Sequence, residues 1–187
     1  PGRIEALVKE LLHPTLDWRA ILRDFVISSV KTDFQMSPPN RRYLWIPTYM
    51  PSMRRGETVE IAAAFDTSGS MSDDDVRNAF SEVKGVMEQF ADFTIHCFMC
   101  DAAVHDYRII MPYEGEIPKR VVGRGGTDFR PVFQEIERRE LWPSCLVYFT
   151  DAWGSFPEVP PAYPVLWVLH TDKKPPFGEV VRYGRQR

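Results

Sequence analysis

The sequence predicts an α/β fold, a doubly wound and mostly parallel sheet with helices on both faces, preceded by a helical N-terminal extension. Two observations carry this prediction. Apolar runs that are too short for helices recur along the chain, and amphipathic segments with helical spacing stand between them. Residues 58–187 are therefore expected to form the sheet domain, and residues 1–57 a helical and proline-rich extension.

The extension contains two predicted helices. Apolar residues recur with helical spacing over residues 4–12, and this helix should end before Pro14. A second helix is expected from Asp17, as its cap, through Val26. Over residues 28–56 the helical pattern is lost, and prolines exclude regular structure from much of this stretch. We expect both helices to pack on the sheet or on a domain further upstream.

The sheet begins with a strand, a helix and a strand. The first strand is expected over residues 59–65, an apolar run that ends in Asp66. Ser72 and Asp75 then form a capping box, and a stripe of apolar residues with helical spacing follows them. The next strand is expected over residues 93–100. This order implies a right-handed crossover and parallel pairing of the two strands.

The second half of the chain supplies the rest of the sheet. An edge strand is expected near residues 107–111, and a loop rich in Gly and Pro follows it. Asp128 is expected to cap the next helix, with Pro131 in its first turn. Three further strands are expected over residues 144–150, 165–170 and 179–183. The sheet should therefore contain five or six strands.

Composition argues against two classes of partner. The formal net charge of −3 and the isoelectric point near 5.8 leave no basic footprint for nucleic acid. No apolar stretch approaches the roughly 20 residues that a membrane helix needs, so no membrane is expected as a partner either. The chain begins with Pro1 rather than with methionine, so we expect it to be part of a longer protein.

Three cysteines are an odd number and too few for a disulfide framework, which indicates a reducing, cytoplasmic compartment. Cys97 and Cys100 form a C-x-x-C pair. They lie in a strand-like run, whereas a thioredoxin-type pair opens a helix and a zinc site needs a second pair. We therefore interpret both as small core residues.

Candidate ligands for a metal ion follow the first predicted strand. Asp66, Ser68 and Ser70 stand at alternate positions of a tight loop. In open α/β sheets, ligands bind at the loops that leave the carboxyl ends of the strands. A carboxylate and two hydroxyls are hard oxygen donors, which suit Mg²⁺ and argue against zinc.

Two later segments supply similar groups. A glycine-rich stretch delivers Thr127 just before a helix, and Asp151 ends the strand of residues 144–150 as Asp66 ends the first strand. The glycines before Thr127 would let its hydroxyl move toward or away from a metal ion. Asp101 and Asp128 are expected no closer than the outer shell of such an ion, and Asp128 is better explained as a cap.

Taken as a set, D-T-S-G-S, G-G-T-D and an apolar strand ending in T-D resemble the metal-ion-dependent adhesion site of von Willebrand factor A (VWA)-type domains over residues 59–170. In that family two serines and the threonine ligate Mg²⁺ or Mn²⁺, and the aspartates bind it directly or through water. The resemblance implies a VWA-like, Rossmann-like sheet domain whose metal ligands are Asp66, Ser68, Ser70, Thr127 and Asp151.

A narrower resemblance adds partners. The amphipathic lead-in, the P-P-N-R-R segment and D-T-S-G-S-M are similar to a bacterial family of VWA-like proteins with a metallopeptidase-like domain upstream. VWA-like proteins of bacteria often work beside AAA+ ATPases, so an AAA+ ATPase or the upstream domain is implied as the partner of a cytoplasmic adaptor. The chain has four histidines and no H-E-x-x-H, so peptidase chemistry is expected outside it.

Counting charges leads to a binding mechanism. Three hydroxyls and two aspartates, not both in direct contact, would leave the cation incompletely neutralised. We therefore expect an Asp or Glu of a protein partner to complete the coordination shell. By analogy with the family, Thr127 moving between direct and water-mediated contact would change affinity. Trp153 and Phe156 are expected to flank the crevice, as anchors for the partner or as packing for its lid.

Two other functions stay open. Ser68, Asp151 and His170 follow the chain order of an α/β-hydrolase triad, but a nucleophile elbow needs glycine where Asp66 and Ser70 stand. A phosphatase with Asp66 as nucleophile would need a second Asp at position 68. We therefore expect no enzyme activity from this chain, and the remaining alternative is a scaffold with a vestigial metal site.

Overall fold

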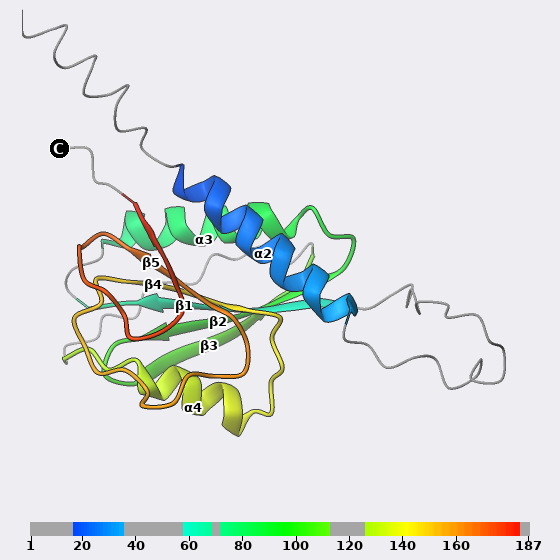
Figure 1. The fold of residues 1–187 in the computed structure, drawn as a ribbon. Coiled ribbons are helices and arrows are strands. Elements are labelled where there is room, and N and C mark those ends of the chain that lie inside the picture. Colours follow the sequence, from blue (N-terminus) through cyan, green and yellow to red (C-terminus); the bar gives the residue numbers. More distant parts are fainter. Residues whose placement is uncertain (1–16, 36–57, 69–71, 113–125, 184–187) are drawn as a thin grey trace, which may run out of the picture.

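The computed structural model describes residues 17–35, 58–68, 72–112 and 126–183. Within these residues a six-stranded sheet has the strand order β3-β2-β1-β4-β5-β6 (Figure 1). The strands are β1 (Val59–Asp66), β2 (Phe93–Cys100), β3 (Val104–Ile110), β4 (Leu146–Thr150), β5 (Val165–Leu169) and β6 (Glu179–Arg182). Strand β3 is antiparallel to β2, and every other neighbouring pair is parallel. The predicted α/β class with a mostly parallel sheet is confirmed.

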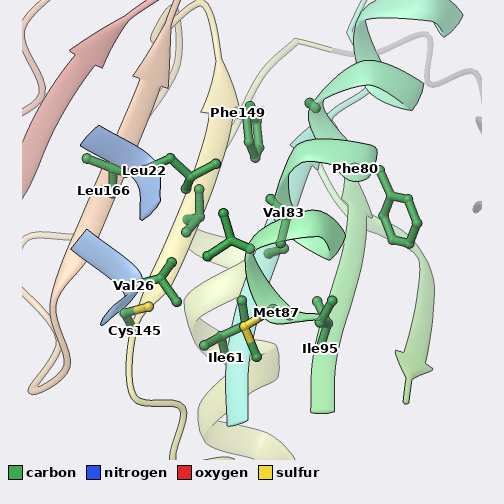
Figure 2. Packing of buried hydrophobic residues seen from close by; sticks show 14 of the residues in the cluster. Leu22, Val26, Ile61, Phe80, Val83, Met87, Ile95, Cys145, Phe149 and Leu166 are labelled. Carbon is green, nitrogen blue, oxygen red and sulfur yellow. The ribbon is translucent and has the colours of Figure 1, made fainter. Parts of the chain in front are cut away.

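Helices cover both faces of the sheet, as predicted. They are α2 (Trp18–Gln35), α3 (Asp73–Met87) and α4 (Arg130–Arg138). Helices α2 and α3 lie on one face and α4 on the other (Figure 1). Figure 2 shows the packing of the first face, where aliphatic side chains such as Leu22 of α2 and Met87 of α3 lie among phenylalanines such as Phe149. The α4 face is richer in aromatic rings, and those of Phe129 and Trp167 meet edge to face there.

Helix α2 is longer than the sequence predicts. The pattern indicates a helix as far as Val26, whereas α2 continues to Gln35. The additional turns are held by packing, because Val30 is buried with the core residues. Asp17 caps the helix as predicted, since its carboxylate accepts a hydrogen bond from the N–H of Arg19 (3.1 Å).

The predicted extension thus contributes a helix that packs on the sheet. The boundary between residues 57 and 58 stays a prediction, and the helix expected over residues 4–12 lies outside the described residues. None of the helices in the described ranges is both long enough and apolar enough to cross a membrane.

Helix α3 begins with the capping box that the sequence predicts. The Ser72 side chain accepts a hydrogen bond from the N–H of Asp75 (3.2 Å), and the Asp75 carboxylate accepts one from the N–H of Ser72 (3.0 Å). Val76, Phe80 and Val83 form the buried stripe. Both ends of the loop that leaves β1 are therefore fixed, one by the strand and the other by this cap.

Helix α4 begins differently from the prediction. The cap position is Phe129, without a side-chain hydrogen bond, and not Asp128. The Asp128 carboxylate accepts the N–H of Arg130 (3.0 Å) and pairs with its guanidinium (2.7 Å), so it still satisfies one free N–H of the first turn. The boundary moves by one residue because the fully buried Phe129 side chain belongs to the core. Pro131 stands in the first turn, as predicted.

The three cysteines are buried and form no disulfide. Residues three apart in a strand point to opposite faces, so Cys97 packs on the α2 and α3 side and Cys100 on the α4 side. Burial raises the pKa of both thiols. These are the properties of core residues, which is the interpretation that the sequence favours.

The strand order places a switch point between β1 and β4. From β1 the chain winds through α3 to β2 on one side, and it returns through α4 to β4 on the other side. The loops at the carboxyl ends of β1 and β4 therefore diverge, and crevices at such points bind ligands in open α/β sheets. Asp66 ends β1, and Asp151 directly follows β4.

Candidate metal centre

Asp66 brings a carboxylate into the interior of the protein, where none of the residue is exposed. The N–H of Ser68 donates to Oδ1 (2.9 Å) and the hydroxyl of Thr150 donates to Oδ2 (2.7 Å). No Lys, Arg or His of the described residues forms an ion pair with this carboxylate. Burial raises the pKa of Asp66. The hydrogen bonds from Thr150 and Ser68 lower it by less, and the negative charge of Asp151 raises it further.

Asp151 stands in a strained turn at the end of β4. Its carboxylate accepts the N–H of Trp153 (2.9 Å), and its carbonyl accepts the hydroxyl of Thr171 (2.6 Å). The next residue, Ala152, has φ 61°, which costs a residue other than glycine roughly 1–2 kcal/mol. Strain of this kind persists only where the surrounding structure imposes it, and it is frequent at binding sites.

Thr127 reaches the same region because Gly154 lacks a side chain. A Cβ at position 154 would lie 2.6 Å from the carbonyl oxygen of Thr127 and 3.0 Å from the ring of Phe129. The two segments also pair through their backbones, since the N–H of Phe129 donates to the carbonyl of Ser155 (2.9 Å). Residues far apart in sequence are thus packed side by side at the carboxyl edge of the sheet.

The end of β2 completes this edge. The backbone N–H of Asp128 donates to the carbonyl of Asp101 (3.0 Å), and the N–H of Thr67 donates to the carbonyl of Cys100 (2.7 Å). Asp101 is buried, and its carboxylate accepts the N–H of Ala103 (3.1 Å) within its own turn. Asp101 therefore supports the loop of Thr127 through its backbone, and its place outside a coordination shell stays a prediction.

Four of the five predicted ligands lie at the end of a strand or on a loop along one edge of the sheet: Asp66, Ser68, Thr127 and Asp151. Ser70 lies outside the described residues. The sequence pattern did not predict that Thr150 bonds to the carboxylate of Asp66 or that Gly154 makes room for the backbone of Thr127. The only signals for these two were a hydroxyl directly before Asp151 and a glycine three residues after it. Their roles depend on contacts between distant segments.

The donor set fits a small divalent cation. A carboxylate offers about four lone-pair positions, so both oxygens of Asp66 keep capacity beyond their hydrogen bonds to Ser68 and Thr150. Carboxylates and hydroxyls are the hard donors that Mg²⁺ prefers. Across the described ranges no three His, Cys, Asp or Glu side chains are grouped to hold a metal, so a cation here would depend on the hydroxyls. Metal ligation by this set stays a prediction.

The hydrolase alternative finds no triad among the described residues. His170 lies at the end of β5 with its Nδ1 3.5 Å from the hydroxyl of Tyr183, and its ring meets that of Tyr183 edge to face. No hydrogen bond of the described part of the chain joins His170 to Ser68 or Asp151. The order of these residues in the sequence is therefore not matched by a hydrogen-bonded arrangement.

Comparisons with known proteins cover both halves of the chain. A family model described as VWA-like domain (DUF2201) matches residues 61–183, and one described as Putative metallopeptidase domain matches residues 1–54. An uncharacterized protein of Thermotoga maritima is 32% identical over 151 residues, which are 79% of this chain and 36% of that protein.

Among solved structures, the chain is similar to the crystal structure of the ArnB paralog VWA2 from Sulfolobus acidocaldarius. The match has a TM-score of 0.41 and 15% sequence identity, and it covers 59% of this chain and 34% of that one. The chain thus spans about a third of the length of both proteins that it matches.

Proposed function

Because the chain belongs to the family of VWA-like domains that its residues 61–183 match, we propose that it binds a protein partner through a divalent cation at the ends of β1 and β4. Family membership supports a role in protein interaction or scaffolding in general. The observation that carries the more specific proposal is the buried carboxylate of Asp66, which lies near Asp151 and has no cationic partner within the described residues.

The proposed ligands of Mg²⁺ or Mn²⁺ are Asp66, Ser68, Ser70, Thr127 and Asp151. A cation held by these residues would supply positive charge where the carboxylates of Asp66 and Asp151 repel each other, and it would attract an oxygen of a partner. Hydrogen bonds from Ser68 and Thr150 orient the carboxylate of Asp66. The strained turn at Ala152 fixes the backbone next to Asp151. The ligand from the partner is proposed to be the carboxylate of an Asp or Glu.

The surface beside Asp151 suits an acidic partner. Trp153 is 61% exposed, and the Lys173 Nζ lies 3.5 Å from the centroid of its indole ring. No carboxylate of the described residues pairs with Lys173. The N–H of Trp153 donates to the carboxylate of Asp151, so the residue that contacts the ammonium is bonded to a proposed ligand. Candidate partners, from the resemblance alone, are an AAA+ ATPase and the metallopeptidase-like domain.

Calorimetric titration with Mg²⁺ and Mn²⁺ tests the proposal. The double variant Ser68→Ala and Ser70→Ala should lose most of its metal affinity, because two of the proposed ligands are absent. Ser81→Ala is the matched control, since Ser81 lies on the exposed side of α3 and its hydroxyl, within the described residues, donates only to the carbonyl of Arg77. Undiminished affinity in the double variant would refute the ligand set. A wild-type protein that takes up no metal at millimolar concentrations would favour a scaffold with a vestigial site.

A further inference from the structure

A groove runs between α4 and the connection from β4 to β5. It is separate from the proposed cation site at the ends of β1 and β4, which we call the metal crevice. The volume of the groove is about 780 Å³. This lies within the roughly 300–1,000 Å³ that is typical of ligand pockets. On one side Phe133 and Glu137 of α4 line it, and on the other side the proline-rich residues 157–163 do so. Apart from Glu158 this second wall is mostly apolar, and it is stiff because its prolines have fixed φ angles.

The groove also holds the most exposed large apolar side chains of the described residues. Trp142 is 83% exposed and Val159 is 77% exposed, and both line the groove. Single exposed apolar residues are common, but two of them beside an apolar hollow mark a surface that gains free energy when it is covered.

The rim of the groove is acidic. Glu137, Glu140 and Glu158 line it, and none of the three forms an ion pair with a described residue. The single basic residue that lines it is Arg130, whose guanidinium is already paired with Asp128 at 2.7 Å. The unpaired charge among the lining residues is therefore negative, and it accompanies apolar side chains such as Trp142 and Val159.

One of these carboxylates, that of Glu140, belongs to a residue with a strained backbone. Helix α4 ends with hydrogen bonds from the N–H of Leu141 to the carbonyl of Ile136 (3.0 Å) and from the N–H of Glu140 to that of Glu137 (2.9 Å). In this type of helix end the left-handed position is usually glycine. Here Glu140 takes it, with φ 55°. The strained residue thus carries a side chain that lines the groove, where glycine would carry none.

We propose that this acidic groove binds an amphipathic peptide segment of a partner protein, whose apolar side chains cover Trp142 and Val159 and whose Lys or Arg side chains pair with the rim glutamates. Charge decides between occupants. An acidic segment would be repelled, and a second copy that used the same face would oppose one acidic rim to another. A basic amphipathic segment is both attracted and able to bury the apolar floor.

The full chain is titrated, with chelator present, into fluorescein-labelled peptides of fourteen residues, one built from Leu and Lys and one from Leu and Glu. Fluorescence anisotropy should show binding of the Leu/Lys peptide only. Affinity should fall about tenfold in Glu137→Gln/Glu158→Gln, and also in Trp142→Ala, which is exposed enough to leave folding intact. Glu88→Gln/Glu179→Gln is the matched control for lost charge, since both residues are exposed and lie outside the groove.

Three results would overturn the proposal. They are equal affinity of the groove and control variants, binding of the Leu/Glu peptide, and absence of binding to the Leu/Lys peptide. Sedimentation velocity supplies a further check. Self-association that Trp142→Ala abolishes would assign the groove to a second copy of the chain. Because chelator is present throughout, failure here would leave the proposed metal site untouched.

Discussion

The metal crevice and the acidic groove differ in whether their carboxylates are buried or exposed to water. In the crevice, Asp66 is buried without a cationic partner among the described residues, so its negative charge is destabilised in the free protein. In the groove, the glutamates are exposed to water and the apolar side chains, such as Trp142, are uncovered instead. The first site would gain free energy by acquiring a cation, and the second by covering apolar surface.

The two regions share one feature. The described residues include two that are not glycine and have positive φ, and one lies in each region, Ala152 after Asp151 and Glu140 at the end of α4. In both places backbone strain accompanies a proposed binding site, as it often does at functional sites. Substitutions that restore stability should therefore reduce binding at one site and leave the other unchanged.

The largest effect is expected from Asp66→Asn. The variant should lose at least about a hundredfold in affinity for Mg²⁺, since loss of an outer partner of a ligand already costs about 10–100-fold. Without metal it should be more stable than the wild type by about 1 kcal/mol, which raises Tm by about 2–4 °C, because a buried unpaired charge is removed. Calorimetry and thermal unfolding measure the two effects. A less stable metal-free variant would show that the carboxylate is neutralised by some other group.

The same carboxylate should leave a signature in the dependence of stability on pH. The pKa of Asp66 is raised above its usual 3.8 in the folded protein. The folded state therefore holds this proton more tightly than the unfolded state does. Stability from this residue is present below pH 3.8 and is lost as pH rises through the raised pKa. Urea unfolding with chelator, from pH 3.5 to 7, should show this loss in the wild type only. Parallel profiles for wild type and Asp66→Asn would contradict it.

Gly154→Ala should have the next largest effect. The added Cβ would lie 2.6 Å from the carbonyl oxygen of Thr127, so a backbone segment must move, at a cost of about 1–3 kcal/mol. Metal affinity should fall with it, because the loop that carries Thr127 is displaced. Gly126→Ala is the matched control, since a Cβ there meets nothing within 4 Å. Equal stability of the two variants in urea unfolding would show that the loop of Thr127 can move aside without a cost in free energy.

The positions of most proposed ligands could be predicted because they follow strands. Asp66 and Asp151 end apolar runs that are readable as buried strands, and the carboxyl ends of parallel strands meet at one edge. The contact of Gly154 with Thr127 could not be predicted, because it depends on the path that the chain takes after β4. The cap of α4 was wrong by one residue for a similar reason, since burial of Phe129 sets that boundary.

The acidic groove was missed entirely. Its proline-rich wall, residues 157–163, reads in sequence as an irregular turn, and nothing in the pattern shows that this turn runs opposite α4. The positive φ of Glu140 could not be predicted either, because glycine is the residue that usually indicates a left-handed position at a helix end, and Glu stands here. Helix α2 was underestimated because its last turns are held by packing and not by a repeating apolar pattern.

Glu140→Gly separates the groove from the crevice. The left-handed backbone at this position should cost a glutamate about 1 kcal/mol relative to glycine, so the variant should be more stable by about that amount. Its affinity for the Leu/Lys peptide should fall, because a rim carboxylate is lost, and its affinity for Mg²⁺ should not change. Urea unfolding and anisotropy test both effects. A variant that gains stability and keeps its peptide affinity would show that the strain serves no binding role.

The smallest effect is expected at the rim of the crevice, from Lys173→Gln. The Lys173 ammonium lies over the Trp153 ring, where a charge of this kind contributes about 0.5–1 kcal/mol. Binding of a Glu-rich peptide in the presence of Mg²⁺ should weaken by about two- to fivefold, while metal affinity stays the same. Lys174→Gln is the matched control, since Lys174 carries the same charge one residue further on and has no ring contact among the described residues. If both variants weaken the peptide equally, general charge and not the indole-held ammonium recognises the acidic partner.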